Sequence, residues 1–426
     1  MAECSGYKDS GAAWIGKIPC VWDVHRLKIH LKRVEEKNPG NVQVLSLYRD
    51  LGIVPKDSRD DNRNVTSEDT SKYKYVQVGD FVVNKMKAWQ GSVAVSDYEG
   101  IVSPAYYVYK FTDSGFNKRY FHYLLRSCYK EEFMRLSEGI RIGQWDLSSD
   151  DLDNVPILLP PTEEQRAIAL YLDNTTKCIE ELISEAKASI EEYKSWKASI
   201  IYEAVTKGLN PGAAMKDSGV EWIGEIPSQW KLVRMKYLID FMPKCDYSFC
   251  KEDTLVTFTP MECIRTGTFE NRSRAYGDID GSYTQYAEGD IVLAKVTPCF
   301  ENGNVCIMSG LHSGVGFGSS ELFVLRPQKV LDRFLFYFLQ HKGFKEAACS
   351  TMTGTGGLKR VSSSFIQNCY VPYPDIDTQK AIADFLDRKC SAIQSLICEK
   401  EALIADLEAY KKSLIFEVVT GKRRVV

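Results

Sequence analysis

The stretch LPPTEEQRAIALYLD, from Leu159 to Asp173, returns later in the chain as YPDIDTQKAIADFLD, from Tyr373 to Asp387. In both copies proline comes just before a long run in which apolar residues recur every three or four positions. Proline suits the start of a helix and not its interior, and Gly208 and Gly421 after the two runs are typical of helix ends. The sequence therefore predicts two long helices of equal length, roughly 60 to 65 Å each at 1.5 Å per residue.

The apolar residues of the two runs form a heptad seam, because steps of alternately four and three residues stay on one face of a helix. One such helix cannot bury its own stripe, so we expect the two helices to pair as an intramolecular coiled coil. An antiparallel pair is favoured, since a duplicated unit that makes the same contact twice generates a two-fold axis. The predicted seam residues of the spacer helices, which are also the candidate subunit-docking residues, are Ile168, Leu172, Ile179, Leu182, Ile382, Leu386, Ile393 and Leu396.

The sequence is also repeated outside the helices. VGDFVVNKM (Val78–Met86) matches EGDIVLAKV (Glu288–Val296), and KDSGAAWIGKIPCVW (Lys8–Trp22) matches KDSGVEWIGEIPSQW (Lys216–Trp230). Short β-branched and aromatic runs, followed by helical patterns, lie between each box and its long helix. The chain is therefore predicted to be a circular, pseudo-two-fold tandem repeat of one α+β unit. We expect a first box and head at residues 1–160, a first spacer helix at 161–208, a second box and head at 209–374, and a second spacer helix with the C-terminal tail at 375–426.

The repeated KDSG box is interpreted as a structural joint. No histidine is repeated near it in both copies, which disfavours a nucleophile turn. The second box follows the first long helix, so its apolar residues are expected to pack on the C-terminal end of that helix. If the two halves are arranged alike, the first box packs near the end of the second helix, around Phe416–Thr420. The expected anchors are Trp14, Ile18 and Trp22 in the first box and Trp222, Ile226 and Trp230 in the second.

The composition is that of an ordinary globular protein, with 426 residues of which 44% are hydrophobic and 26% charged. No apolar run approaches the roughly 20 residues of a membrane span, and the first residues lack a signal-peptide pattern, so we expect a cytoplasmic protein with no membrane partner. Thirteen cysteines without a CxxC pair fit reduced thiols. Five of them cluster in the second half with spacings that match no zinc pattern, so no metal site is predicted. They are Cys245, Cys250, Cys263, Cys299 and Cys306.

No catalytic constellation is found in the sequence, which lacks a phosphate loop, a GxGxxG after a strand and the motif of an amino-methyltransferase. The remaining signals are basic and amide side chains beside glycines. Arginine and lysine suit guanine edges and phosphates, and glutamine suits adenine. The candidate DNA-binding residues are Lys85, Lys87, Gln90, Arg141 and Gln144 in the first half and Lys295, Thr355, Lys359 and Arg360 in the second.

Two variable heads, each led by a WIGxIPxxW box and followed by a helix that begins PPTEEQRAIALYLD or PDIDTQKAIADFLD, resemble the specificity subunit of type I restriction-modification systems over essentially the whole chain. The helix ends YEAVTKG and FEVVTGK carry the same resemblance. It implies that each head is a target recognition domain that reads one half of a bipartite, asymmetric DNA site. It also implies that the helices separate the heads and dock modification subunits.

The partners implied by the resemblance are double-stranded DNA, two DNA methyltransferase (M) subunits and restriction (R) subunits. The chain itself would then be non-catalytic and hold no cofactor. S-adenosylmethionine for adenine N6 methylation, ATP and Mg would belong to the partner subunits.

Two alternatives stay open at this point. In the first alternative, the chain serves as the specificity subunit of a stand-alone methyltransferase or of a fused restriction-methylation enzyme. These assemblies differ in the partner protein and not in this chain. A more distant alternative is a coiled-coil adaptor whose two heads bind ligands other than DNA. Such an adaptor predicts no salt-dependent affinity for duplex DNA.

Overall fold

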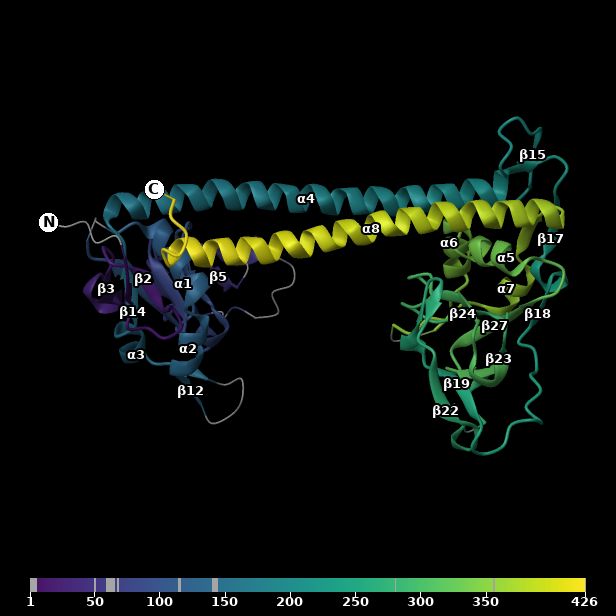
Figure 1. Cartoon of the computed structure of the whole chain (residues 1–426), viewed down its shortest axis with the longest axis horizontal. Coiled ribbons are helices and arrows are strands. Elements are labelled where there is room, and N and C mark those ends of the chain that lie inside the picture. Colours follow the sequence, from purple (N-terminus) through teal and green to yellow (C-terminus); the bar gives the residue numbers. More distant parts are fainter. Residues whose placement is uncertain are drawn as a thin grey trace. The chain divides into compact units, whose positions relative to one another are not determined.

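The structure is a computed structural model of the chain (Figure 1). It describes residues 6–49, 51–58, 66, 69–113, 116–139, 145–279, 281–354 and 357–425. The chain divides into two compact units, unit 1 with residues 1–186 and 402–426, and unit 2 with residues 187–401. Two long helices, α4 (Thr162–Lys207) and α8 (Ile376–Val419), contribute to both units. Each unit therefore holds one head together with part of each long helix.

In unit 1 the first half of α4 packs against the last part of α8, as Figure 1 shows at the end where the C-terminus is marked. Ile168 and Ile179 of α4 share a buried core with Leu414 of α8. Glu180 of α4 forms an ion pair with Lys411 of α8. Because the start of one helix contacts the end of the other, the two helices are antiparallel here.

Unit 2 contains the reciprocal arrangement. Ile201, near the end of α4, shares a core with Ile382 and Leu386, near the start of α8. The ammonium group of Lys197 donates to the Gln394 side chain at 3.3 Å. The predicted antiparallel pairing of the long helices is confirmed in each unit.

The buried stripe of the helices follows the predicted seam at only some of the predicted positions. Leu182 is 46% exposed and Leu396 is 38% exposed, whereas Ile397 is buried and Ile183 is half-buried. Placing Leu182 and Leu396 in the seam was therefore wrong by one residue. Because an α-helix has about 3.6 residues per turn, two neighbouring rows of side chains both fit alternating steps of three and four residues. The partner helix covers the row that contains Ile183 and Ile397 and not the row that contains Leu182 and Leu396. The predicted residues that are buried are Ile168, Leu172, Ile179, Ile382, Leu386 and Ile393.

The head of unit 1 is built around an antiparallel sheet of order β4-β11-β8-β9. Side chains alternate between its two faces, so Phe81 and Val83 enter the core shared with the long helices, while Val82 enters a smaller core. Two further strand pairs complete the smaller core, Leu45–Tyr48 with Gly52–Pro55 and Lys74–Val76 with Gly100–Val102. The described elements of unit 1 are β1 Tyr7–Asp9, β2 Lys17–Pro19, β3 Asp23–Arg26, β4 Leu31–Val34, β5 Leu45–Tyr48, β6 Gly52–Pro55, β7 Lys74–Val76, β8 Phe81–Asn84, β9 Val93–Val95, β10 Gly100–Val102, β11 Tyr106–Phe111, α1 Lys118–Cys128, α2 Lys130–Leu136, β12 Ser137–Glu138, β13 Asp146–Leu147, α3 Ser149–Asp153 and β14 Pro156–Leu159.

The head of unit 2 repeats this plan with the sheet β18-β27-β24-β25 and contains a second four-stranded sheet, β22-β19-β26-β23, whose counterpart in unit 1 is two strand pairs joined by a parallel bridge between Val44 and Ile101. Within that second sheet β19 and β26 run parallel. The elements of unit 2 besides the long helices are β15 Met215–Asp217, β16 Glu225–Pro227, β17 Lys231–Arg234, β18 Ile239–Phe241, β19 Leu255–Thr259, β20 Ile264–Arg265, β21 Thr268–Phe269, β22 Arg272–Ala275, β23 Thr284–Ala287, β24 Ile291–Ala294, β25 Val305–Ile307, β26 Val315–Gly318, β27 Leu322–Pro327, α5 Asp332–Leu339, α6 Lys342–Ser350, α7 Ser363–Asn368 and β28 Tyr370–Tyr373.

Both KDSG boxes are turns that precede a buried anchor. Asp9 accepts the backbone N–H of Gly11 at 2.8 Å, and Asp217 accepts that of Gly219 at 2.9 Å. An aspartate that binds the backbone two residues on fixes a turn, so the DSG sequence has a structural use here.

The anchors of the two boxes pack on the ends of the two long helices as predicted. Ile226 and Trp230 share a core with Val205 near the end of α4. Ile18 and Trp22 share a core with Leu414, Val418 and Val419 at the end of α8, and Trp14 and Phe416 pack at its margin. The α+β class and the tandem repeat are confirmed by this correspondence.

Candidate nucleic-acid interface

A buried glutamine ties each head to the start of its long helix. The Gln165 side-chain oxygen accepts the backbone N–H of Asn117, just before α1, at 2.8 Å, and its amide donates to the Pro160 carbonyl at 2.8 Å. Gln379 makes the same two bonds in unit 2, at 2.8 and 2.9 Å. This explains why glutamine occurs at this place in both helix starts.

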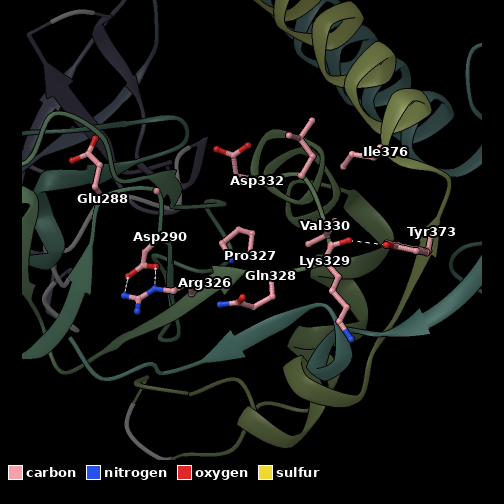
Figure 2. Close-up of a pocket in the computed structure, with 12 residues that line it drawn as sticks. Glu288, Asp290, Arg326, Pro327, Gln328, Lys329, Val330, Asp332, Tyr373 and Ile376 are labelled. Carbon is pink, nitrogen blue, oxygen red and sulfur yellow. Dashed lines mark hydrogen bonds and ion pairs between the residues drawn. The ribbon is translucent and has the colours of Figure 1, made fainter. Parts of the chain in front are cut away.

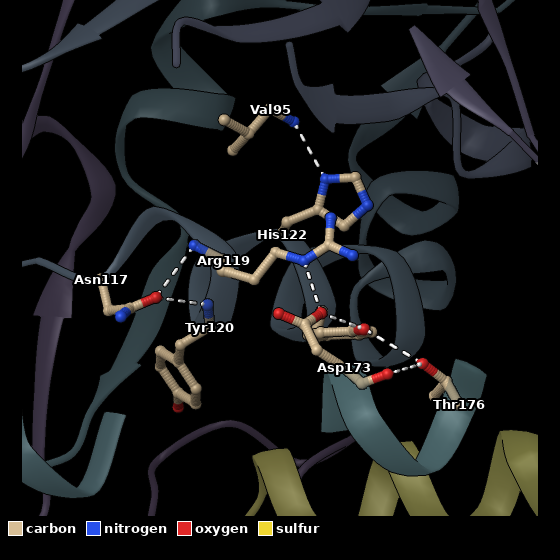
Figure 3. A network of polar contacts seen from close by, with 8 residues as sticks. Val95, Asn117, Arg119, Tyr120, His122, Asp173 and Thr176 are labelled. Carbon is tan, nitrogen blue, oxygen red and sulfur yellow. Dashed lines mark hydrogen bonds and ion pairs between the residues drawn. The ribbon is translucent and has the colours of Figure 1, made fainter. Parts of the chain in front are cut away.

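A second attachment joins α1 to α4 through Asp173 (Figure 3). Arg119 and the Tyr123 hydroxyl both donate to one carboxylate oxygen of Asp173 at 2.7 Å. Tyr123 also contacts the Thr176 hydroxyl at 3.2 Å. Next to this network His122 accepts the backbone N–H of Val95, and burial lowers the pKa of His122 to about 3, so the imidazole is neutral.

The same attachment is present in unit 2 between α5 and α8. The Arg333 guanidinium donates to Asp384 at 2.7 Å and also pairs with Asp387. The Tyr337 hydroxyl donates to Asp387 at 2.7 Å. Each head is thus fixed to its long helix by the same types of side chain.

In unit 1 the predicted residues Lys85, Lys87 and Gln90 follow the end of strand β8. The chain turns sharply there, because Gly91 has a φ of +88° and closes a turn that Ala88–Gln90 form. Lys87 is exposed, and Lys87 and Gln90 line a pocket of about 420 Å³. The Lys85 ammonium pairs with Asp146 at 2.9 Å, and this bond raises the pKa of Lys85 above its ordinary value.

Three predicted residues of unit 2 lie together at the end of strand β24. Lys295 directly follows this strand, and backbone hydrogen bonds hold Lys359 and Arg360 beside it. Thr297 donates its N–H to the Lys359 carbonyl at 3.0 Å, and its hydroxyl accepts the N–H of Lys359 at 3.0 Å. Arg360 donates to both carboxylate oxygens of Glu321, from Nε at 2.8 Å and from Nη2 at 2.7 Å.

The backbone shows that these two places correspond. Lys85 bonds to Ala105 through its N–H and to Leu147 through its carbonyl, at 3.1 and 3.0 Å. Lys295 makes the same bonds to Glu321 and Val361, at 3.1 and 2.9 Å. Each head therefore presents one loop fastened across the end of its central sheet, with a cation–carboxylate pair at the fastening point.

Of the remaining predicted residues, Arg141, Gln144 and Thr355 lie outside the described residues. The acidic partners Asp146 and Glu321 were not predicted. An edge-to-face contact between Trp89 and Trp145, with ring centroids 5.3 Å apart, was also missed. Both tryptophans stand next to glycine-containing loops in the sequence, and this shared position is the signal from which their contact could have been predicted.

A separate polar pocket of about 690 Å³ lies in unit 2 between the β24–β27 region and the start of α8 (Figure 2). The buried Asp290 carboxylate accepts two bonds from Arg326, at 2.7 and 2.8 Å. The Tyr373 hydroxyl donates to the Lys329 carbonyl at 2.7 Å. None of the predicted DNA-binding residues that the structure describes lines this pocket.

The clustered cysteines of unit 2 do not assemble a metal site with other ligands among the residues that the structure describes, where no group of three or more His, Cys, Asp or Glu side chains is placed to hold an ion. Over the same residues, every helix is too short or too polar to span a bilayer.

Both halves of the chain match the family model described as type I restriction modification DNA specificity domain, at residues 23–192 and 227–403. The chain is similar to the specificity subunit of the type I restriction enzyme EcoAI from Escherichia coli, with 36% identity over 163 residues, or 37% of this chain and 27% of that protein. Its match to the EcoEI specificity subunit of the same organism also spans 27% of that protein. The MjaVIII specificity subunit from Methanocaldococcus jannaschii is 26% identical over 424 residues, which cover 96% of this chain and 94% of that protein.

Two solved structures share the fold. One comes from work on complex assembly and conformational transition of the type I R-M system, with a TM-score of 0.71, 15% identity, and coverage of 95% of this chain and 99% of that one. The other is the HsdS subunit from Thermoanaerobacter tengcongensis, with a TM-score of 0.56, 17% identity, and coverage of 95% and 98%.

Proposed function

The chain belongs to the type I restriction-modification DNA specificity family, and we propose that it is the subunit that selects the DNA sequence for a type I restriction-modification complex. The resemblance inferred from the repeated boxes and helix starts is confirmed by the two family matches. The observation that carries the proposal is the pair of corresponding loops, each with lysine or arginine at the end of a central sheet. In this proposal each head reads one half of a bipartite site in double-stranded DNA.

The two loops favour an asymmetric target. They share backbone hydrogen bonds but differ in side chains, with Lys85 and Asp146 in one head and Arg360 and Glu321 in the other. Weak binding of each head to its half-site combines into specific binding of the whole site, because the second head binds at high effective concentration once the first head is bound.

We further propose that the helices dock two methyltransferase subunits, and through them restriction subunits, in the cytoplasm. Apolar side chains outside the buried stripe support this, since Leu182, Trp196, Leu396 and Leu403 are between 38% and 48% exposed. Two of these side chains lie on α4 and two on α8, and exposed apolar patches are typical of interaction surfaces. S-adenosylmethionine, ATP and Mg would be held by those partners, and the chain itself would be non-catalytic.

Binding to duplex DNA as a function of salt tests the proposal. A DNA reader that neutralises several phosphates loses affinity steeply and linearly on a logarithmic salt scale, and we expect co-purification of a methyltransferase. Absence of salt-dependent duplex binding would favour the adaptor with two ligand-binding heads. Co-purification of a single fused polypeptide, or of a methyltransferase without restriction subunits, would identify the alternative assemblies.

The docking surface is tested by two pairs of variants with matched chemistry. Leu182→Glu with Leu396→Glu alters exposed side chains, so the thermal unfolding midpoint should stay near the wild-type value while methyltransferase co-purification falls. Ile179→Glu with Ile393→Glu places charges in the buried stripe and should cost several kcal/mol of stability, on the order of 3 to 5. Full retention of the methyltransferase by the first pair would remove these side chains from the proposed surface.

A further inference from the structure

Arg360 is held in place through both its backbone and its side chain. Its N–H and carbonyl pair with Thr353 at 2.8 and 3.1 Å, and it forms a second bridge with Val296. The neighbouring Val361 N–H is bound by the Lys295 carbonyl. The guanidinium is then fixed by the two bonds from Nε and Nη2 to Glu321. Little rotamer entropy remains to be lost when such a side chain binds a ligand.

Glu321 is itself fixed by the sheet. Its carbonyl accepts the Lys295 N–H at 3.1 Å, and its own N–H donates to the Ser319 hydroxyl at 3.2 Å. Hydrogen bonding to Arg360 lowers the pKa of the Glu321 carboxyl below its ordinary value, so the group is ionised near neutral pH. The carboxylate is therefore a firm, charged support for the guanidinium.

One edge of the guanidinium stays available. Of its five N–H groups, the carboxylate takes one from Nε and one from Nη2, and no hydrogen bond joins Nη1 to any residue in the described part of the chain. The Arg360 side chain is 49% exposed. The free Nη1–Nη2 edge presents two parallel donors, the arrangement that matches the O6 and N7 acceptors of guanine in the major groove.

We propose that Arg360 reads a guanine in the half-site bound by the second head, and that Glu321 is the positioning residue that presents the guanidinium edge to it. This inference rests on the proposed function. A phosphate also offers two oxygens to arginine, but an ionised carboxylate within hydrogen-bonding distance of the same guanidinium repels a phosphate. A neutral guanine edge carries no such repulsion, so the supported arginine favours the base.

Among the described residues, the first head has no arginine–carboxylate pair of this kind at the corresponding place. Ala105 occupies the position of Glu321, and the cation is the Lys85 ammonium, a point charge without two parallel donors. The guanine is therefore expected only in the half-site bound by the second head, and selection of bound duplexes can locate it there.

The test is selection of bound duplexes from a random library by the full-length chain, as wild type, Glu321→Gln, Arg360→Gln and a control, Glu270→Gln. The control is matched because Glu270 holds Arg272 with the same two-bond geometry, at 2.9 and 2.8 Å, elsewhere on the same head. Both altered pairs lie at the surface, so the thermal midpoints of the glutamate variants should equal the wild-type value.

We expect the wild type to select a bipartite sequence with a guanine at one position of one half-site. Arg360→Gln and Glu321→Gln should each reduce the preference at that position by roughly 5- to 100-fold, while the other positions and the Glu270→Gln control stay unchanged. Replacing that guanine by 7-deazaguanine, which lacks N7, should weaken binding of the wild type but leave Arg360→Gln unaffected.

A phosphate contact would give a different result and overturn the inference. Arg360→Gln would then weaken all duplexes alike and lower the salt slope by about one, and Glu321→Gln would strengthen binding to all duplexes by removing a negative charge. The proposed function would survive that result, because the wild type would still select a sequence. If the wild type selected none, the proposed function and the inference would both fail.

Discussion

The joint between the first box and the end of α8 can be tested by adding one methyl group at Gly421. This glycine follows α8 with a φ of +70°, and a Cβ built on it would stand 2.4 Å from the Pro19 ring and 3.0 Å from the Trp22 ring. A left-handed φ costs a non-glycine residue roughly 1 to 2 kcal/mol. A methyl group forced into a rigid, well-packed site typically costs about 1 to 3 kcal/mol more. We therefore expect Gly421→Ala to destabilise unit 1 by roughly 2 to 5 kcal/mol.

Two other glycines of the repeat serve as graded controls. Gly208 follows α4 with a φ of +76°, and its nearest contact to a built Cβ is 3.0 Å, to Trp230, so the neighbour has to yield by only a few tenths of an ångström. Gly219 has a φ of +69° with nothing within 4 Å of a built Cβ. Gly219→Ala should thus show the backbone cost alone, Gly208→Ala slightly more, and Gly421→Ala the most.

Unfolding in urea can be followed peptide by peptide with hydrogen exchange and mass spectrometry. Peptides from each joint then report the stability of their own unit. In Gly421→Ala, peptides covering residues 7–22 and 416–425 should exchange faster than wild type, while those covering residues 202–230 stay unchanged. Equal effects of Gly421→Ala and Gly219→Ala would refute the packing of the first box on the end of α8.

Three further predictions concern buried ionisable groups. Burial lowers the pKa of His341 from 6.5 to about 4, so the unfolded chain binds the proton first and unit 2 should lose stability as pH falls from 6.5 to 4, by up to roughly 3 kcal/mol at 1.36 kcal/mol per pKa unit. His341→Asn keeps an acceptor for the Phe344 N–H at the start of α6 and should flatten the pH dependence of the urea midpoint in this range; an unchanged slope would contradict the assignment. Burial raises the pKa of Asp80, so this group stabilises unit 1 more as pH falls through that pKa, and Asp80→Asn should match or exceed wild-type stability at pH 7. Asp290→Asn removes the charge that Arg326 binds and should cost about 3 kcal/mol by the same urea assay; equal effects of Asp80→Asn and Asp290→Asn would contradict a stabilising role of the Arg326–Asp290 pair.

Elements that bury a regular stripe were predictable from the sequence. The strands β8 and β24 lie in the repeated apolar runs FVVNKM and IVLAKV that the sequence indicated, and both long helices begin after the expected prolines. The second sheet of unit 2 was not predicted, because its strands are short and several are polar, as in the RSRA sequence of β22. The choice between neighbouring rows of the helix seam was also beyond the sequence, since both rows carry apolar residues.

The loops were predictable as a class, and their electrostatics were not. Basic residues beside glycines identified Lys85 and Arg360, but their acidic partners are 61 and 39 residues away in the chain. Such pairs depend on which strand ends meet, and that follows from the sheet register. The sequence therefore located the cations and missed the carboxylates that restrain them.

The attachments through Gln165 and Gln379 have a consequence for how the gene can change over time. Each fixes a head with backbone atoms and a buried amide, and neither involves the loops that carry Lys85 or Arg360. Substitutions of exposed side chains in those loops therefore leave these two attachments unchanged. Within this one gene the two copies are expected to drift apart fastest at the loop tips, and new target sequences can arise there while the scaffold is maintained by purifying selection.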